Sequence, residues 1–405
     1  MARVVIVSSG HLCTNPRVWR EADALATAGH DVTVTGVWLD STHAEWDRAL
    51  LADRPWSFVP AADLRGHSPR SAVARLRARA RSKVGRIRVH AGLGDDPHAL
   101  GYAVDRLERT AFRLTPDLVV CHLEPGLWVA ERLAARGVAI ALDIEDWYSE
   151  NDADLPATNA GRMQVAGLEQ RVFARARATT TTSHAMAHAL AEHFGMAAPG
   201  VVYNGTSVPP IGAADATGPL RLVWVSQTIG VGRGLEELLP ALRLVEAPWQ
   251  LTLIGSVGSA YRLWAEEQLG AHASRLRWRA QVPPEELPGL ISTHHVGLAL
   301  ELPLCRNKDL TVSNKLFHYL QGGLAVVASD TAGQREVMRQ LPSHGALFPA
   351  GDVDALAERL STMAADDSPS RGGRAERHAS ANARFDATLQ GAASVRMVAQ
   401  ALETA

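Results

Sequence analysis

Short apolar runs alternate with longer amphipathic stretches in the first half of the chain. The alternation predicts a strand over residues 4–8, a helix over residues 17–28 that ends at Gly29, and a strand over residues 32–37. Further strands are predicted over residues 118–121, 139–143, 179–182 and 201–203, and further helices over residues 126–136 and 164–178. Strands that alternate with helices in this way indicate a parallel α/β sheet.

The same pattern starts again after residue 219. It predicts strands over residues 222–225, 250–254 and 296–300, and helices over residues 235–245 and 260–269. Residues 207–219 are rich in Pro, Gly and small side chains without periodicity, so we expect a linker there. The chain therefore predicts two α/β domains, over residues 1–206 and 220–384. A helical pattern over residues 376–404 ends the chain, and we assign residues 385–405 to a separate C-terminal helix.

Residues 313–329 combine an amphipathic helix with a directly following apolar strand. Ser313 is a favourable N-cap residue, and Gly322 with Gly323 supplies the left-handed conformation that ends a helix. The apolar positions at helical spacing are Leu316, Phe317 and Leu320. A helix N-terminus presents unpaired N–H groups and a partial positive charge, so this segment predicts a phosphate site beside Lys315.

Lysine is rare in this chain, which makes Lys315 more informative. Of 41 basic residues only Lys83, Lys308 and Lys315 are lysines, and the last two lie just before or within residues 313–329. For Lys308 we favour a solvated surface position.

Residues 226–234 form a Gly-rich stretch between a predicted strand and a predicted helix. This is where backbone N–H groups can cradle a phosphate, and Arg233 can add a bidentate contact. A dinucleotide-binding turn would have glycine where Leu235 stands and an acidic residue near the end of the following strand, at 254–256. The stretch therefore predicts a phosphate site and argues against a dinucleotide site.

Polar residues follow the predicted strands of the N-terminal half. His122 and Glu124 come after the strand over 118–121, and Asp143 and Glu145 close the strand over 139–143. Ligands of open α/β sheets collect at the carboxyl ends of strands, so these side chains can bind hydroxyl groups or move a proton. Two alternatives stay open. His122 can be a hydrogen-bonded structural residue. Asp143 and Glu145 can bind a sugar or a metal, or they can belong to a helix N-terminus, where acidic side chains suit the helix dipole.

Composition narrows the class of protein. A chain of 405 residues with 46% hydrophobic residues and a formal net charge of −2 is typical of a globular protein of two domains without a global attraction for nucleic acid. The three cysteines are widely spaced and contain no CxxC pair, which argues against a disulfide framework or a zinc site. We expect a cytoplasmic protein without a signal peptide or a membrane-spanning helix.

Residues 65–88 contain nine basic residues and no acidic one. The apolar positions that recur on one helical face are Val73, Leu76, Ala80, Val84 and Ile87. Such a helix can lie on anionic lipid or bind an acidic acceptor. We favour a surface helix that packs this apolar stripe onto the sheet, because the stripe lacks the bulky aromatic residues common in helices at membrane surfaces.

With these segments described, the chain resembles the family 4 glycosyltransferases, which have the GT-B fold. The resemblance covers nearly the whole length and depends on residues 28–32, 143–150, 202–205 and 313–329. It implies two Rossmann-like domains that face each other across a cleft, with the final helix crossing back to the first. It also implies a retaining, metal-independent enzyme without a cofactor, with a place in glycoconjugate or natural-product biosynthesis. The nucleotide-sugar donor would bind the C-terminal domain, and a small-molecule or glycan acceptor the N-terminal one.

The resemblance also implies roles for single residues. Arg233 and Lys315 would hold the donor diphosphate, and His122 would lie near the transferred sugar. The other positions implied to line the donor site are Gly10, Gln227, Gly232, Gln281, Val282, Asp309, Thr311, Ser313, Asn314, Leu316 and His318. The positions expected to bind the acceptor are Asn15, Arg17, Glu124, Asp143 and Glu145.

The chain departs from the family pattern at the sugar and ribose contacts. The two glutamates that the family places eight residues apart fall on Leu310 and His318, and Gln227 stands where a second basic residue is usual. Asp309 or Glu301 could replace the sugar contact, and the departures indicate an unusual donor. The alternatives are a nucleotide-sugar epimerase of the same fold and a binding protein without catalysis.

Overall fold

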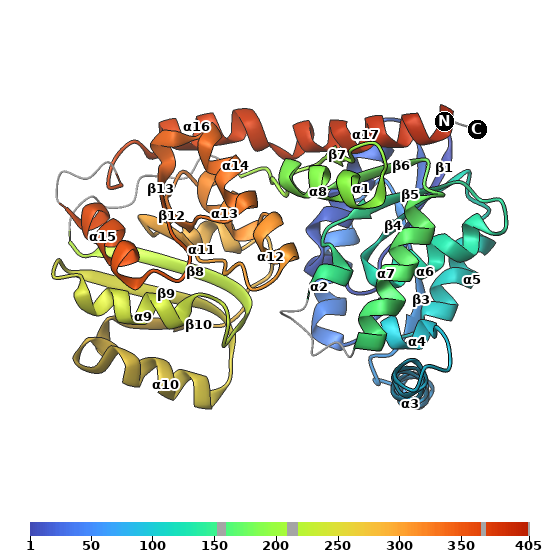
Figure 1. Ribbon diagram of the computed structural model, residues 1–405, viewed down its shortest axis with the longest axis horizontal. Coiled ribbons are helices and arrows are strands. Elements are labelled where there is room, and N and C mark those ends of the chain that lie inside the picture. The colour runs from blue at the N-terminus through green and yellow to red at the C-terminus, as the bar shows by residue number, and fades with distance from the viewer. Residues whose placement is uncertain (152–158, 209–217, 366–369, 404–405) are drawn as a thin grey trace. The chain divides into compact units, whose positions relative to one another are not determined.

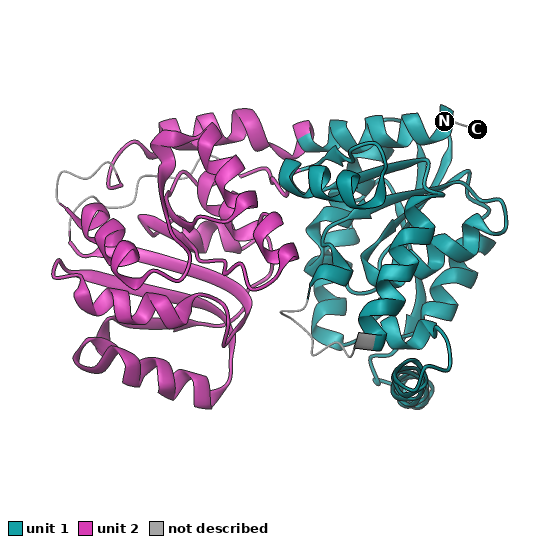
Figure 2. Ribbon diagram, in the orientation of Figure 1, with its two compact units in different colours: residues 1–202, 390–405 teal, residues 203–389 magenta. Residues whose placement is uncertain are grey.

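The computed structural model describes residues 1–151, 159–208, 218–365 and 370–403. The chain divides into two compact units, which Figure 2 shows in different colours. The first unit comprises Met1–Val202 together with Gln390–Ala405, and the second comprises Tyr203–Leu389. Most of the expected linker, at 209–217, lies outside the described residues.

The first unit is built on a seven-stranded sheet in which every pair of neighbouring strands is parallel (Figure 1). Its strands are β1 (Arg3–Val7), β2 (Asp31–Trp38), β3 (Ser57–Asp63), β4 (Leu118–His122), β5 (Ile140–Ile144), β6 (Ala178–Thr181) and β7 (Gly200–Val201). Its helices are α1 (Pro16–Thr27), α2 (Ser41–Leu51), α3 (Pro69–His90), α4 (Pro97–Leu100), α5 (Val104–Arg113), α6 (Leu123–Ala134), α7 (Asn159–Phe173) and α8 (His184–Phe194). The strand order is β3-β2-β1-β4-β5-β6-β7.

The second unit repeats this plan with six parallel strands in the order β10-β9-β8-β11-β12-β13. The strands are β8 (Leu220–Ile229), β9 (Trp249–Val257), β10 (Leu276–Arg279), β11 (Val296–Ala299), β12 (Ala325–Ser329) and β13 (Gly345–Phe348). The helices are α9 (Leu235–Leu244), α10 (Ser259–Leu269), α11 (Leu287–Ile291), α12 (Arg306–Leu310), α13 (Asn314–Gln321), α14 (Ala332–Gln340), α15 (Val353–Ala364) and α16 (Arg374–Phe385). Two parallel, doubly wound sheets confirm the predicted α/β fold with two Rossmann-like domains.

Alternate residues of the buried strands supply the two faces of the second sheet. In β12, Val327 packs with α9 and α15, whereas Val326 and Ala328 pack with α13 and α16. A parallel sheet covered on both faces reads as a continuous apolar run, which is why residues 324–328 show no polar alternation.

Helix α17 (Ala387–Glu403) follows α16 after a break at Asp386, so the helical pattern over 376–404 forms two helices and not one. The Asp386 carboxylate accepts a hydrogen bond from the Thr388 amide (2.8 Å) and thereby caps the new helix. From Gln390 onward the chain belongs to the first unit, where Met397, Val398 and Ala401 pack in one cluster with Leu25 of α1.

Several element boundaries differ from the predicted ones. Strand β8 continues to Ile229, so residues 226–229 are strand and only 230–234 form the Gly-rich turn. The helix predicted over 164–178 begins earlier and ends at Phe173. Residues 184–194, for which no element was predicted, form α8, and α2, β3 and α4 are further elements without a prediction.

The expected packing of α3 is wrong. The stripe predicted to cover the sheet is exposed, with 47% of Val73, 69% of Leu76, 55% of Val84 and 57% of Ile87 accessible to solvent. The residues that α3 buries are instead Ser71, Ser82, Gly85 and Val89. Among the helices of the described residues, none is long and apolar enough to cross a bilayer.

Candidate functional site

Each sheet reverses its strand order once, and ligands of open α/β sheets bind beyond the carboxyl ends of the strands at such a point. In the first unit the reversal lies between β1 and β4, and in the second between β8 and β11. His122 ends β4, the Gly-rich turn follows β8, and Glu301 follows β11. The topology therefore selects the same loops as the sequence motifs.

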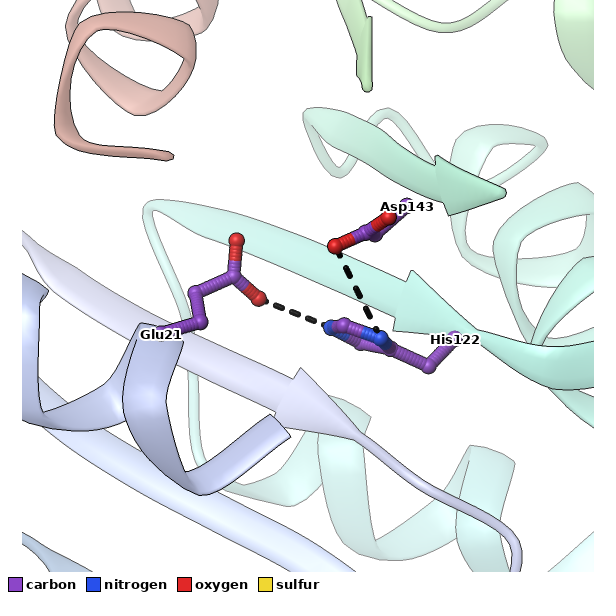
Figure 3. A group of neighbouring side chains, drawn as sticks. All are labelled: Glu21, His122 and Asp143. Atoms are coloured by element: carbon purple, nitrogen blue, oxygen red, sulfur yellow. Dashed lines mark hydrogen bonds and ion pairs between the residues drawn. The ribbon is translucent and has the colours of Figure 1, made fainter. Parts of the chain in front are cut away.

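His122 is fully buried at the carboxyl end of β4 and lies between carboxylates. Its Nε2 is 2.7 Å from Glu21 and its Nδ1 is 3.1 Å from Glu145 (Figure 3 shows the Glu21 contact). Burial alone would lower the pKa of His122, but Glu145, Glu21 and Asp143 outweigh it and raise that pKa to about 10. The carboxylates therefore favour the protonated ring, in which both nitrogens can donate.

Arg17 and Asp143 form a buried bidentate ion pair beside this histidine. The guanidinium Nε and Nη2 each lie 2.8 Å from an Asp143 oxygen, and Arg17 also donates to the Val202 carbonyl. Burial would raise the pKa of Asp143, but Arg17 and then His122 lower it below its usual range. The carboxylate thus stays charged inside the unit.

Asn15 connects this group to the start of α1. Its side chain accepts a hydrogen bond from the Arg17 amide (3.2 Å) and donates to Glu145 (2.7 Å). Four predicted residues, Asn15, Arg17, Asp143 and Glu145, therefore meet His122 in one network. In it, 18% of the Glu145 side chain is exposed, against 0% for His122, so Glu145 is the member open to solvent.

Glu21 is a member of this network that the sequence analysis missed. It lies one helical turn after Arg17, on the same face of α1 as the buried Val18 and Ala22. An acidic residue on the apolar stripe of a helix is the signal that could have identified it, because a buried carboxylate needs a charged or hydrogen-bonded partner.

Glu21, His122 and Asp143 also satisfy the distance requirement for a metal site, with one ligand atom from each within 4.8 Å (Figure 3). A histidine must be neutral to bind a metal, and here both ring nitrogens lie against carboxylates that favour the protonated ring. Both oxygens of Asp143 are bound by Arg17. The chemistry of these groups therefore fits an ion-pair network better than a metal centre.

The loop after β1, which carries Gly10, is fixed by a second buried pair. His11 Nδ1 donates to Asp47 (2.7 Å), and its Nε2 accepts from the amides of Leu39 (2.9 Å) and Asp40 (3.2 Å). This pattern requires the neutral tautomer with a proton on Nδ1. A side chain added to Gly10 would meet no atom within 4 Å, so the backbone there borders open space.

Two further carboxyl groups of the first unit have strongly perturbed pKa values. Burial, followed by the Asp146 charge, raises the pKa of Glu124 in the first turn of α6 to about 7. Burial likewise raises the pKa of Glu169 to about 7, although the Ser149 hydroxyl and amide donate to it. Glu124 can therefore exchange a proton near neutral pH.

These shifts predict a pH dependence of stability. A carboxyl whose pKa rises from 4.5 to about 7 on folding binds its proton more tightly in the folded state. The contribution of this tighter proton binding to the free energy of unfolding is present in full below about pH 4.5, and it is lost as the pH rises through about 7. We expect the melting temperature of the Glu169→Gln variant to change less between about pH 5 and pH 8 than that of the parent protein. At about pH 8, the free energy of unfolding of the variant should exceed that of the parent by on the order of 1–3 kcal/mol. The control is the exposed Glu192→Gln, and an equal slope in both variants would contradict the assignment.

In the second unit, Lys315 lies in the first turn of α13 and forms an ion pair with Glu301. The two charged atoms are 2.7 Å apart, with 12% of the lysine side chain exposed, and Nζ lies 5.0 Å from the centre of the Trp224 ring. Burial would raise the pKa of Glu301, but Lys315 lowers it. Ser313 is the N-cap residue by its backbone, but its side chain makes no capping hydrogen bond, which corrects the expected role of its hydroxyl.

The Gly-rich turn lies against the residues that precede Glu301. Gly232 and Gly234 adopt left-handed conformations (φ 76° and 78°), and a Cβ on Gly234 would come within 2.5 Å of Leu300. Only glycine permits both the conformation and this approach. Arg233, exposed in the turn, donates to the Ser226 hydroxyl at 3.3 Å. The turn with Arg233 and the Lys315–Glu301 pair are therefore neighbours at one edge of the sheet.

The remaining donor positions differ in their exposure and in their contacts. Leu316 is fully buried, so only its backbone faces the N-terminus of α13, and Asn314 and Gln227 are exposed. Asp309 accepts from the Ala332 amide (2.9 Å), and the Thr311 hydroxyl donates to the Asn307 carbonyl (2.8 Å), so these two side chains hold connections within the unit. Gln281, Val282 and His318 have intermediate exposure.

Comparison with known families gives two matches that follow one another along the chain. Residues 14–205 match the glycosyl transferase 4-like domain, and residues 219–366 match the glycosyl transferases group 1 family. Among curated proteins, none matches the chain by sequence.

Solved structures share the fold at low sequence identity. Anabaena HepE in complex with UDP and glucose superposes with a TM-score of 0.68 at 15% identity, over 100% of both chains. A glycosyltransferase from Rickettsia africae gives 0.64 at 10% identity, over 100% of this chain and 99% of that one. A proposed UDP-N-acetylglucosamine 2-epimerase from Listeria monocytogenes gives 0.56 at 11% identity, over 94% of each. These likenesses show a common two-unit architecture.

Proposed function

The chain belongs to the glycosyl transferases of group 1, with the GT-B fold, and on that premise we propose that it moves a sugar from a nucleoside-diphosphate sugar to an acceptor. We further propose that the transfer retains the configuration of the sugar and needs no metal ion. One observation supports the proposed transfer. Lys315 at the N-terminus of α13 and the turn that carries Arg233 lie close together where the strand order of the second sheet reverses, between β8 and β11.

These groups suit a diphosphate because they supply positive charge without a metal. Lys315 is held by Glu301 at 2.7 Å, in the first turn of a helix whose dipole favours anions. Arg233 is exposed and can reach a second phosphate oxygen as a bidentate donor. A bound diphosphate would share the Lys315 ammonium with Glu301.

The chemistry that follows from this arrangement is stabilisation of the leaving group. The bond between the sugar carbon and the diphosphate oxygen breaks, and its electron pair stays on the diphosphate, where Arg233 and Lys315 balance the new charge. The acceptor hydroxyl oxygen bonds to the same face of the sugar carbon. Its proton passes to a phosphate oxygen of the departing nucleotide, which accounts for every proton without an added base.

The buried network of the first unit is proposed to position the acceptor. Glu145 is the partly exposed member, and it accepts hydrogen bonds from Asn15 (2.7 Å) and His122 (3.1 Å). Because the His122 ring is buried and charged, we propose that it acts through Glu145 as a positioning residue. Glu145 would then accept a hydrogen bond from an acceptor hydroxyl.

A nucleotide screen tests the donor site. We expect one nucleoside diphosphate to raise the apparent stability, by about 2.7 kcal/mol at a ligand concentration one hundred times Kd, because it binds only the folded state. Lys315→Ala should abolish this shift, and the control Arg243→Ala, an exposed arginine elsewhere in the second unit, should keep it. A shift that survives Lys315→Ala and Arg233→Ala would contradict the proposed site.

Epimerisation is a second candidate, favoured by the shared fold with the Listeria protein and by the Glu124 carboxyl, whose pKa of about 7 suits proton transfer. Products formed from the donor alone separate the two activities, because an epimerase needs no acceptor.

A further inference from the structure

Helix α3 presents an apolar stripe to solvent on the side opposite its packed face. At about 100° per residue, Ser71, Ser82, Gly85 and Val89 fall on one side of this 22-residue helix. The residues that fall on the other side are Val73, Leu76, Ala80, Val84 and Ile87. Their exposed fractions, up to 69% for Leu76, agree with this arithmetic. The stripe is therefore a property of the folded unit as well as of the sequence.

Close packing fixes this orientation. A Cβ on Gly85 would lie 2.9 Å from the Ala99 amide nitrogen and 2.9 Å from an Asp96 oxygen, so α3 lies directly against α4 and the residue before it. Figure 1 shows α3 next to α4 at the margin of the first unit. The helix also starts with a capping box between Ser68 and Ser71. A rotation that buried Leu76 would have to break this contact.

Basic residues border the stripe on both sides. On one flank, by the same arithmetic, are Arg70, Arg77, Arg81 and Arg88. On the other flank are Arg79, Lys83 and Arg86. Arg81 and Arg88 approach Asp105 and Asp96 at 3.5 Å, but more than half of each arginine side chain is exposed, so these pairs hold them only weakly. The flanks therefore keep a strong excess of positive charge.

We propose that α3 docks the protein on an anionic membrane surface. The apolar stripe would enter the boundary between headgroups and acyl chains, while the arginines extend their stems along it and bind lipid phosphates. The charge complementarity argues for an anionic bilayer as the occupant. Nucleic acid would use the basic residues but gain nothing from five aliphatic side chains, because bases stack on aromatic rings.

The pattern also explains why the whole-chain charge gives no sign of this surface. The formal net charge is −2, whereas residues 65–88 hold nine basic residues and no acidic one. The attraction is local and falls off within a Debye length, so docking would depend on the face that α3 presents.

Vesicle sedimentation of the full chain tests the proposal. We expect binding to vesicles of one third phosphatidylglycerol in phosphatidylcholine, at least about tenfold weaker binding to pure phosphatidylcholine, and loss of binding as salt is raised. Leu76→Ser combined with Ile87→Ser should weaken binding to the anionic vesicles at least about tenfold, because burial of apolar area contributes to it. Leu263→Ser, with 67% exposure on α10, is the matched control and should bind as the parent does.

A second set of variants tests how the positive charge of α3 contributes to vesicle binding. Arg77→Gln with Arg86→Gln should weaken binding as strongly, whereas the control pair Arg132→Gln with Arg243→Gln, two exposed arginines on α6 and α9, should not. A protein that stays in the supernatant with anionic vesicles would overturn the proposal. Binding that is unchanged by Leu76→Ser with Ile87→Ser, or equal affinity for a soluble polyanion such as heparin, would show a purely electrostatic partner and overturn it as well.

Discussion

Replacing Lys315 by alanine is expected to lower turnover by at least about a hundredfold, the scale found when one preorganised charge-stabilising donor is removed. Lys315 is largely enclosed, with Glu301 at 2.7 Å and the Trp224 ring at 5.0 Å, so the surrounding water can replace its charge only in part. Arg233→Ala should reduce turnover to a similar degree through the second phosphate contact. The measurement is kcat for sugar transfer, with the donor nucleotide identified by the thermal-shift screen.

Two controls separate this effect from a loss of folding. Lys315→Arg retains the charge and should recover part of the turnover, whereas Arg243→Ala removes an exposed charge of the same unit and should leave kcat unchanged. The melting temperature of each variant reports the cost of leaving Glu301 without its ion pair. Near-normal kcat in both Lys315→Ala and Arg233→Ala would remove these residues from the mechanism.

Arg17→Ala is expected to destabilise the first unit by about 3–5 kcal/mol, the cost of leaving a buried charge without its partner. Arg17 and Asp143 are 6% and 1% exposed, and two hydrogen bonds of 2.8 Å join them. Hydrogen exchange of the β4 and β5 amides measures this loss within the first unit, because those strands lie at the centre of its sheet.

An exposed pair provides the matched control. Arg3 and Asp117 are about half exposed and 3.8 Å apart, so Arg3→Ala should cost no more than about 1 kcal/mol. The double variant Arg17→Met with Asp143→Leu removes both charges and should be less destabilised than the sum of the two single changes. A loss below 1 kcal/mol in Arg17→Ala would show that water reaches Asp143.

We propose which carboxylate replaces the sugar contact at which the chain departs from the family pattern. By the resemblance, Leu310 and His318 occupy the positions of the two usual glutamates, and Glu301, two residues after β11, forms the ion pair with Lys315. Asp309, the other residue considered for the sugar contact, instead accepts the Ala332 amide. We therefore favour Glu301 over Asp309 as the carboxylate available to the donor sugar.

Local sequence was sufficient for the elements whose signals are local. The helix and strand over residues 313–329, the strands β4 and β5, and the left-handed Gly323 follow from periodicity, apolar runs and glycine at a helix end. The continuation of β8 to Ile229 did not follow, because pairing of Thr228 and Ile229 with Ser256 and Val257 of β9 makes those residues strand. That pairing partner is far away in the sequence.

By itself the sequence determined two parallel α/β units, the residue types at the ends of their strands, and the concentration of arginine in residues 65–88. Only the tertiary structure decided which groups meet: Glu21 with His122, Arg17 with Asp143, and Lys315 with Glu301. It also decided that α3 buries Ser71, Ser82, Gly85 and Val89 and turns Val73, Leu76, Val84 and Ile87 to solvent. The physical reason is that periodicity fixes which residues share a face, whereas the close approach of Gly85 to Ala99 selects the face that is buried.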